Sequence, residues 1–235
     1  MVRFKSMSRC YAFVLIMFTG LLSQGANASL IHMETTMGAI DIELFDNVAP
    51  VTVANFKNYV NDGDFINSFF HRSVPGFIVQ GGGFRFDGVS FSYVPEDAPI
   101  VNEFSLSNLR GTLAMAKLSG DPDSATSQWF VNLADNSANL DGQNGGFTVF
   151  GQILGNGMDV IDAIAALPQY NITGIHSAFT DVPLDGYDGI FDPASQLVRV
   201  TAVTAVPVPA AVWLFLSGML GLVSVARRRV HSVQD

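Results

Sequence analysis

A succession of short apolar runs, each bounded by glycine, asparagine or proline, constrains the fold more than any other feature of this chain. Four of them lie between residues 69 and 154, and they read FFHRSVPGFIVQ, GTLAMAK, SQWFVNL and GFTVFGQIL. Runs of this length and composition are typical of β-strands in a barrel or a sandwich. We therefore expect a mostly β domain.

A hairpin, two helices and a last strand complete the expected order. Residues 30 to 45 alternate between apolar and polar around a central Met-Gly pair, which predicts two adjacent antiparallel strands. Apolar residues recur at helical spacing after Pro50, and Gly63 ends that helix. The same spacing predicts a second helix from Met158 to Leu167, ahead of a proline. The segment SQLVRVTAVTAV, residues 195 to 206, predicts the last strand.

The first 28 residues predict export. Basic residues precede an apolar run of twelve, residues 11 to 22, and Ala26-Asn27-Ala28 then supplies the small-x-small pattern of a signal peptidase site. A retained anchor is the alternative, but a membrane-spanning helix needs about 20 apolar residues. We expect residues 1 to 28 to be a signal peptide that is cleaved after Ala28.

The C-terminal end predicts a membrane segment. An uncharged run of seventeen residues, 210 to 226, is followed at once by three arginines, residues 227 to 229. A buried core helix is the alternative, but apolar residues on every face and a basic stop favour a membrane helix whose arginines face the cytoplasm. We therefore expect an exported domain in the periplasm, at the cell surface or outside the cell, with transient or retained anchoring in the inner membrane.

The charge balance of the domain excludes one class of partner. Residues 29 to 209 carry 20 acidic and 6 basic side chains, a net charge of 20 − 6 = 14 negative. Such a balance repels nucleic acid and anionic lipid, so we expect no nucleic-acid partner. The single cysteine, Cys10, lies within the expected signal peptide, so the mature domain has no disulfide.

Residues 206 to 235 resemble the PEP-CTERM sorting tail of Gram-negative bacteria, which has a short proline motif, a hydrophobic helix and an arginine cluster in that order. Here Val206-Pro207-Val208-Pro209 stands where that family has Val-Pro-Glu-Pro. The resemblance implies that an exosortase removes the tail during export.

Four motifs, in one order, resemble the cyclophilin family over roughly Leu30 to Leu167. They are FHRSVPGFIVQGGGF, GTLAMAK, SATSQWFVNLADN and GFTVFGQILGNGMDVID. The resemblance implies that residues 29 to 205 form an eight-stranded antiparallel closed β-barrel capped by two α-helices. It also implies a peptidyl-prolyl cis-trans isomerase without a cofactor, acting on proline-containing peptides and unfolded exported proteins. We expect a monomer.

The chemistry of such a site follows from the peptide bond. Resonance raises the barrier to rotation to about 18–20 kcal/mol, and only X-Pro bonds populate the cis form appreciably. Twisting localises the lone pair on the proline nitrogen, so a donor fixed opposite that nitrogen stabilises the transition state more than either ground state. Arginine suits this task because it stays charged and presents several donors in a rigid plane. The reaction requires no metal, nucleophile or titrating base.

By resemblance, Arg72 occupies the catalytic position, and an ordinary surface-strand arginine is the alternative reading. The resemblance also implies an apolar proline pocket, two amides that hold the peptide backbone, and a stretch that lies along the peptide. These residues are, in that order, Phe77, Ile78, Phe130, Leu140 and Phe147; Gln80 and Gln128; Ala116 and Lys117. The aromatic residues among them have core packing as their alternative reading, and a glutamine on a strand could simply face water.

Three positions depart from the family's pattern. Phe147 stands where the family has a histidine, and it can still pack on a proline ring. Asn139 replaces a large aromatic residue and removes apolar wall, and Lys117 stands where asparagine or arginine is usual. The alternative function is therefore a non-catalytic peptide-binding or cell-surface, matrix-associated module, although Arg72 together with an intact pocket favours the enzyme.

Other polar groups do not predict a site. The aspartates between residues 121 and 141 lie in loops without the spacing of a calcium-binding loop, so no metal is expected. The glycines at 81 to 83 are followed by neither a lysine-serine pair nor a helix, which argues against a phosphate-binding loop. We expect His71, next to Arg72, to be structural because isomerisation transfers no proton.

Overall fold

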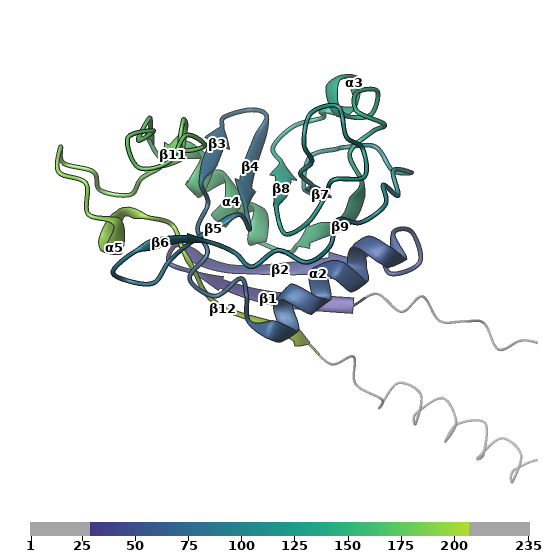
Figure 1. Ribbon diagram of the computed structural model, residues 1–235, viewed down its shortest axis with the longest axis horizontal. Coiled ribbons are helices and arrows are strands. Elements are labelled where there is room, and N and C mark those ends of the chain that lie inside the picture. The colour runs from purple at the N-terminus through teal and green to yellow at the C-terminus, as the bar shows by residue number, and fades with distance from the viewer. Residues whose placement is uncertain (1–28, 207–235) are drawn as a thin grey trace, which may run out of the picture.

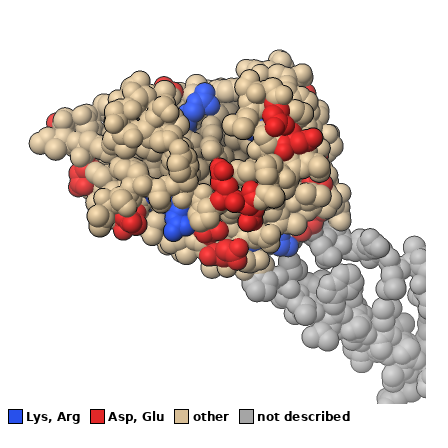
Figure 2. Space-filling model, in the orientation of Figure 1, with Lys and Arg blue, Asp and Glu red and all other residues tan. Residues whose placement is uncertain are grey.

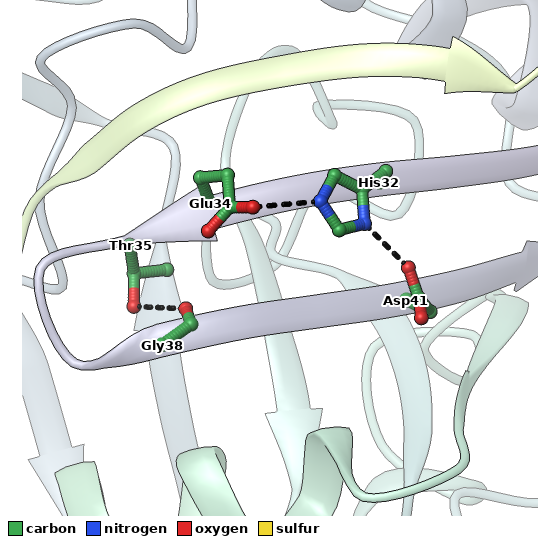
Figure 3. Close-up of polar contacts among 5 residues, drawn as sticks. All are labelled: His32, Glu34, Thr35, Gly38 and Asp41. Atoms are coloured by element: carbon green, nitrogen blue, oxygen red, sulfur yellow. Dashed lines mark hydrogen bonds and ion pairs between the residues drawn. The ribbon is translucent and has the colours of Figure 1, made fainter.

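The alternation that begins at Ser29 builds the first hairpin, from β1 (Ser29–Thr35) and β2 (Gly38–Leu44). The computed structural model describes residues 29 to 206, so the predicted signal peptide and sorting tail lie outside the described residues. Within the hairpin, Ile31 pairs with Ile42, and the apolar side chains of both strands point into the core. At the turn, the Thr35 hydroxyl donates to the Gly38 carbonyl at 2.7 Å (Figure 3). The predicted hairpin is confirmed.

The opposite face of this hairpin carries a histidine between two carboxylates. His32 Nδ1 lies 2.6 Å from Asp41 Oδ1, and His32 Nε2 lies 2.8 Å from Glu34 Oε1 (Figure 3). The hydrogen bonds to Asp41 and Glu34 raise the pKa of His32 above its usual value. A polar cluster of this kind suits the outer, solvent-exposed face of the sheet, while the inner face packs against the core.

One eight-stranded antiparallel sheet forms the body of the domain (Figure 1). Its order is β12-β1-β2-β9-β7-β8-β4-β3. The six strands not yet given are β3 (Arg72–Val74), β4 (Ile78–Gly81), β7 (Thr112–Met115), β8 (Trp129–Asn132), β9 (Val149–Leu154) and β12 (Val200–Val206). Two small hairpins flank it, β5 (Phe84–Phe86) with β6 (Phe91–Tyr93) and β10 (Gln169–Tyr170) with β11 (Val182–Pro183).

The prediction that the barrel is closed is wrong, because β3 and β12 are the two edges of an open sheet. The segments next to these edges meet only through an isolated bridge between Phe69 and Arg199 and a few backbone hydrogen bonds. Asn67 has a φ of 65°, in the left-handed region, so the chain turns just where a closing strand would have to extend. The sheet therefore curves without a continuous closing ladder.

Two long helices pack against this sheet, as expected. α2 (Pro50–Asp62) begins at a proline and ends at Gly63, whose φ is 75°, and it packs against β12. α4 (Gly157–Ala166) packs against β2, β4 and β9 (Figure 1). The side chain of Glu103 accepts hydrogen bonds from the first backbone N–H groups of α2, which no residue of the helix itself could satisfy.

Two single-turn helices were not predicted, α3 (Ser137–Leu140) and α5 (Pro193–Gln196). α5 occupies the start of the segment that we expected to be strand, because Pro193 stands at its first position and the Asp192 carboxylate accepts from the Ala194 N–H. Between residues 29 and 206, no helix combines the length and the apolar character needed to cross a membrane. The predicted membrane helix, residues 210 to 226, lies beyond that range.

Candidate active site

Residues that share a register on neighbouring strands build the candidate site. Arg72 on β3 lies opposite Gln80 on β4, and Gln80 lies opposite Phe130 on β8. Phe130 in turn lies opposite Ala114 on β7. Residues directly opposite each other in a sheet project from the same face, so the register sets a guanidinium, an amide and an aromatic ring in one row.

The alternation along β8 assigns its residues to two packed faces. Trp129 and Val131 point into the main core, whereas Phe130 belongs to a separate apolar cluster on the outer face with Ile78 and Leu140. Residues 129 to 131, Trp-Phe-Val, are therefore all apolar because both faces of β8 are covered. The outer cluster forms the floor of the candidate site.

A cavity of about 240 Å³ lies over this floor. Its lining residues are Arg72, Phe77, Ile78, Gln80, Ala116, Lys117, Phe130, Leu140, Gln143 and Phe147. Nine of the ten predicted site residues are thus brought together, and their roles remain predictions. Sequence reasoning missed Gln143, which lies in a loop whose composition indicates only a turn.

The tenth predicted residue, Gln128, lies in an adjoining cavity of about 360 Å³. The two cavities share Gln80, Ala116 and Lys117 in their walls. Gln80 Nε2 donates to Gln128 Oε1 at 3.0 Å, so the two predicted amides meet at the boundary between the cavities. Asn139 is exposed on α3 and lines neither cavity, although its side chain accepts a hydrogen bond from Gln143.

Arg72 differs from the other basic residues of the described chain in having no protein partner. Among residues 29 to 206, its half-buried guanidinium makes no hydrogen bond or ion pair. The other five bases all have partners: Lys57 with Ser29 and Asp46, Arg85 with Asp64, Arg110 with Asp162, Lys117 with Asn144 and Gly146, and Arg199 with Ala194. Figure 2 shows acidic groups spread over the face in view, with few basic groups among them. The donors of Arg72 are thus not engaged by any residue between 29 and 206.

His71 is buried, with 2% of its surface exposed, and its ring packs edge-on against Phe84. Burial, and to a smaller extent the positive charge of Arg72, lowers the pKa of His71 to about 3. The ring is therefore neutral at physiological pH and does not change its protonation state there. This geometry agrees with a structural role.

Gly81 ends β4, and Gly82 directly after it brings the backbone close to Trp129. Gly82 has a φ of 76°, and a Cβ atom there would lie 2.6 Å from the Ser127 carbonyl oxygen and 2.7 Å from the Trp129 ring. Only glycine fits both the conformation and the space. Within the described residues, no group of three His, Cys, Asp or Glu side chains is placed to hold a metal.

Comparison with protein families and curated proteins identifies relatives of this chain. Residues 30 to 183 match the family described as cyclophilin type peptidyl-prolyl cis-trans isomerase/CLD. A peptidyl-prolyl cis-trans isomerase of Acinetobacter baylyi is 42% identical over 73% of this chain and 90% of its own length. Peptidyl-prolyl cis-trans isomerase A of Dickeya dadantii is 45% identical over 60% of this chain and 73% of its own. Isomerase B of Escherichia coli K12 is 41% identical over 66% and 92% respectively.

Solved structures share the fold. A crystal structure of a cyclophilin type peptidyl-prolyl cis-trans isomerase from Cryptosporidium parvum has a TM-score of 0.56 and 21% identity, and the match covers 77% of this chain and 99% of that one. A second structure of that protein, in the presence of the dipeptide Ala-Pro, has a TM-score of 0.54 at 21% identity and covers 76% of this chain. At this identity the likeness establishes the fold.

Proposed function

This chain belongs to the cyclophilin family and is a peptidyl-prolyl cis-trans isomerase. From that premise, we propose that it acts on X-Pro bonds of exported proteins and that Arg72 is its catalytic group. The observation that carries the assignment of Arg72 is its unpaired guanidinium at the edge of an apolar cavity. Phe130 and Leu140 line the same cavity as Arg72, so a proline ring held on them would lie in the cavity that Arg72 borders.

In this mechanism the protein supplies a positively charged hydrogen-bond donor and a surface that positions the proline ring. A guanidinium donor directed at the proline nitrogen stabilises the lone pair that appears as the amide twists. The apolar floor holds the ring, and the Gln80 and Gln128 amides supply polar contacts for the peptide backbone. Neutral, buried His71 takes no part, because no proton moves in the reaction.

The experiment that tests this assignment is exchange NMR on a short X-Pro peptide with the full-length protein. Acceleration of exchange that Arg72→Ala removes supports Arg72 as the catalytic group. Acceleration that survives the substitution contradicts the assignment. Peptide binding without acceleration by the folded, unaltered protein would instead support a binding module.

For export, the support is the signal-peptide pattern together with the position of Ser29. The Ser29 backbone nitrogen lies 2.7 Å from Asp46 Oδ2, and the Ser29 hydroxyl lies 2.9 Å from Asp46 Oδ1. Cleavage after Ala28 would convert that nitrogen into a charged amino group beside a carboxylate. Charge-assisted hydrogen bonds of this kind are about twice as strong as neutral ones, so the predicted cleavage site suits the fold.

For the tail, we propose that residues 210 to 226 span the inner membrane transiently. An exosortase then removes the tail during export. Intact-mass analysis of the protein from its own host tests both ends. A mass that begins at Ser29 and ends before residue 210 supports both steps. A mass from Ser29 to Asp235 contradicts removal of the tail and leaves export in place.

A further inference from the structure

The turn from Asn144 to Gly146 has an unusual backbone. Its three residues have φ angles of 51°, 74° and 77°, all in the left-handed region. Gly146 has no room for a side chain, since a Cβ atom there would lie 2.3 Å from the Phe104 ring. A turn of this shape needs fixed partners for its carbonyl groups, because consecutive left-handed residues make no regular backbone ladder.

One ammonium group supplies two of those partners. Lys117 Nζ donates to the Asn144 carbonyl at 2.8 Å and to the Gly146 carbonyl at 2.6 Å. The carbonyl between them, Gly145, accepts from Asn102 Nδ2 at 2.7 Å. Every carbonyl of the turn is therefore held by a side chain from elsewhere in the chain.

The same ammonium also contacts the cavity wall. Lys117 Nζ lies 4.9 Å from the centre of the Phe147 ring, within the range of a cation–π interaction. Phe147 follows the turn directly and packs edge-on against Phe130, with ring centres 5.8 Å apart. The Phe147 backbone is also bonded to Leu140 and Asn108, so the turn that Lys117 holds is one of the contacts that set the position of this wall.

We propose that Lys117 is a positioning residue for the proline cavity: its ammonium fixes the 144–146 turn and, through it, the Phe147 ring. This inference rests on the proposed function of the cavity. It differs from the contact with bound peptide that the sequence predicts, because two donors and the charge of Lys117 already engage the turn and the ring.

Lys117→Met tests the proposal, because methionine keeps an unbranched apolar stem and removes the charge. A less rigid cavity wall weakens the binding of the substrate and of the transition state equally. We therefore expect KM and the peptide Kd to rise about 3- to 10-fold while kcat stays within about twofold. Lys117→Arg keeps the charge and should restore most of the affinity. Lys57→Met is the matched control, since Lys57 lies away from both cavities, and it should leave KM unchanged.

A double-mutant cycle with Phe147→Leu decides whether Lys117 acts through the ring. If it does, Lys117→Met adds less than about twofold in the Phe147→Leu background. Full additivity overturns the proposal, as does an unchanged KM in Lys117→Met alone. An effect that changes sign between peptides with an acidic and a basic residue before proline also overturns it, because that pattern marks direct contact with substrate.

Peptide Kd values and the backbone amide shifts of residues 144 to 147 give readouts that need no turnover. If the unaltered protein fails to accelerate exchange, the proposed function fails, whereas the Kd cycle still tests Lys117. Shifts of these amides in Lys117→Met but not in Lys57→Met support the proposal. Unchanged amides in Lys117→Met contradict it.

Discussion

Arg72 and Gln80 lie directly opposite each other on β3 and β4, and the Gln80 amide is itself held by Gln128 at 3.0 Å. The guanidinium thus stands beside a polar group of fixed orientation, with no acidic partner to compete for it in the described chain. The register of two short strands places a free donor next to an apolar cavity.

Arg72→Ala should lower kcat/KM by about 100- to 1,000-fold, which corresponds to about 3 to 4 kcal/mol, because it removes the donor to the proline nitrogen. Stability should change little, since the side chain is half-buried and has no partner among the residues that the structure describes. Exchange NMR and thermal unfolding measure the two effects. Arg72→Lys keeps the charge but loses the planar donor array, so it should recover only part of the activity. Full recovery would show that charge alone is sufficient.

Gln80→Leu should lower kcat/KM about tenfold, because it removes an amide from the cavity wall that we propose to bind the peptide backbone, and it leaves the Gln128 carbonyl oxygen without its donor. Gln128→Leu should have a similar effect. The double variant should lower kcat/KM by less than the product of the two single effects. The measurement is kcat/KM for all four proteins on one peptide. Independent effects would mean that the pair does not act as a unit.

Gly82→Ala should destabilise the fold more than Gly76→Ala, although the two glycines have nearly equal φ angles of 76° and 73°. The left-handed conformation costs alanine about 1 to 2 kcal/mol at either site. At Gly82 the new Cβ also meets Ser127 and Trp129, which adds about 1 to 3 kcal/mol, whereas nothing lies within 4 Å at Gly76. Urea unfolding of both variants gives the difference, and equal losses would contradict the close packing at Gly82.

His71 should make stability depend on pH in the weakly acidic range. Its folded pKa of about 3 lies below the unfolded value of about 6.5, so below pH 6.5 the unfolded chain binds a proton that the folded chain does not. Stability from this group is present above pH 6.5 and falls as pH decreases toward 3, by at most about 1.4 kcal/mol per pH unit. Urea unfolding between pH 5 and 6.5 should show this slope in the unaltered protein and lose it in His71→Gln. The same slope in both proteins would assign it to other groups.

Asp46→Asn should destabilise a chain that begins at Ser29 by about 1 kcal/mol more than it destabilises the uncleaved chain. In the cleaved form the Ser29 nitrogen is a charged amino group, whereas in the uncleaved form it is a neutral amide that bonds to the same carboxylate. Thermal or urea unfolding of the four proteins isolates this coupling. Equal effects in both forms would remove the support that Asp46 lends to cleavage after Ala28.

Local patterns in the sequence were sufficient for the first hairpin and the two long helices, but not for the single-turn helices α3 and α5. Alternation predicted the β1–β2 hairpin, and apolar spacing with a proline start and a glycine end predicted α2. The four motifs pointed to nine of the residues that line the cavity through their resemblance to the cyclophilin family, whereas alternation gives the side-chain direction only of those in strands, such as Arg72, Gln80 and Phe130.

Tertiary contacts decided what alternation does not encode. The open edge between β3 and β12 depends on the left-handed Asn67, and the place of Gln143 in the cavity depends on how its loop folds back. The direction of Lys117 is the clearest case, because a long flexible side chain takes the partners that the folded chain presents.

The sequence by itself determined a mostly β domain and two long helices, because side-chain periodicity and turn residues act over a few positions, and its resemblance to the cyclophilin family indicated nine residues around one cavity. Only the tertiary structure decided that Arg72 has no partner within residues 29 to 206 and that Lys117 holds the 144–146 turn. Both facts depend on which groups, far apart in the chain, come within a few ångströms of each other when the sheet curves.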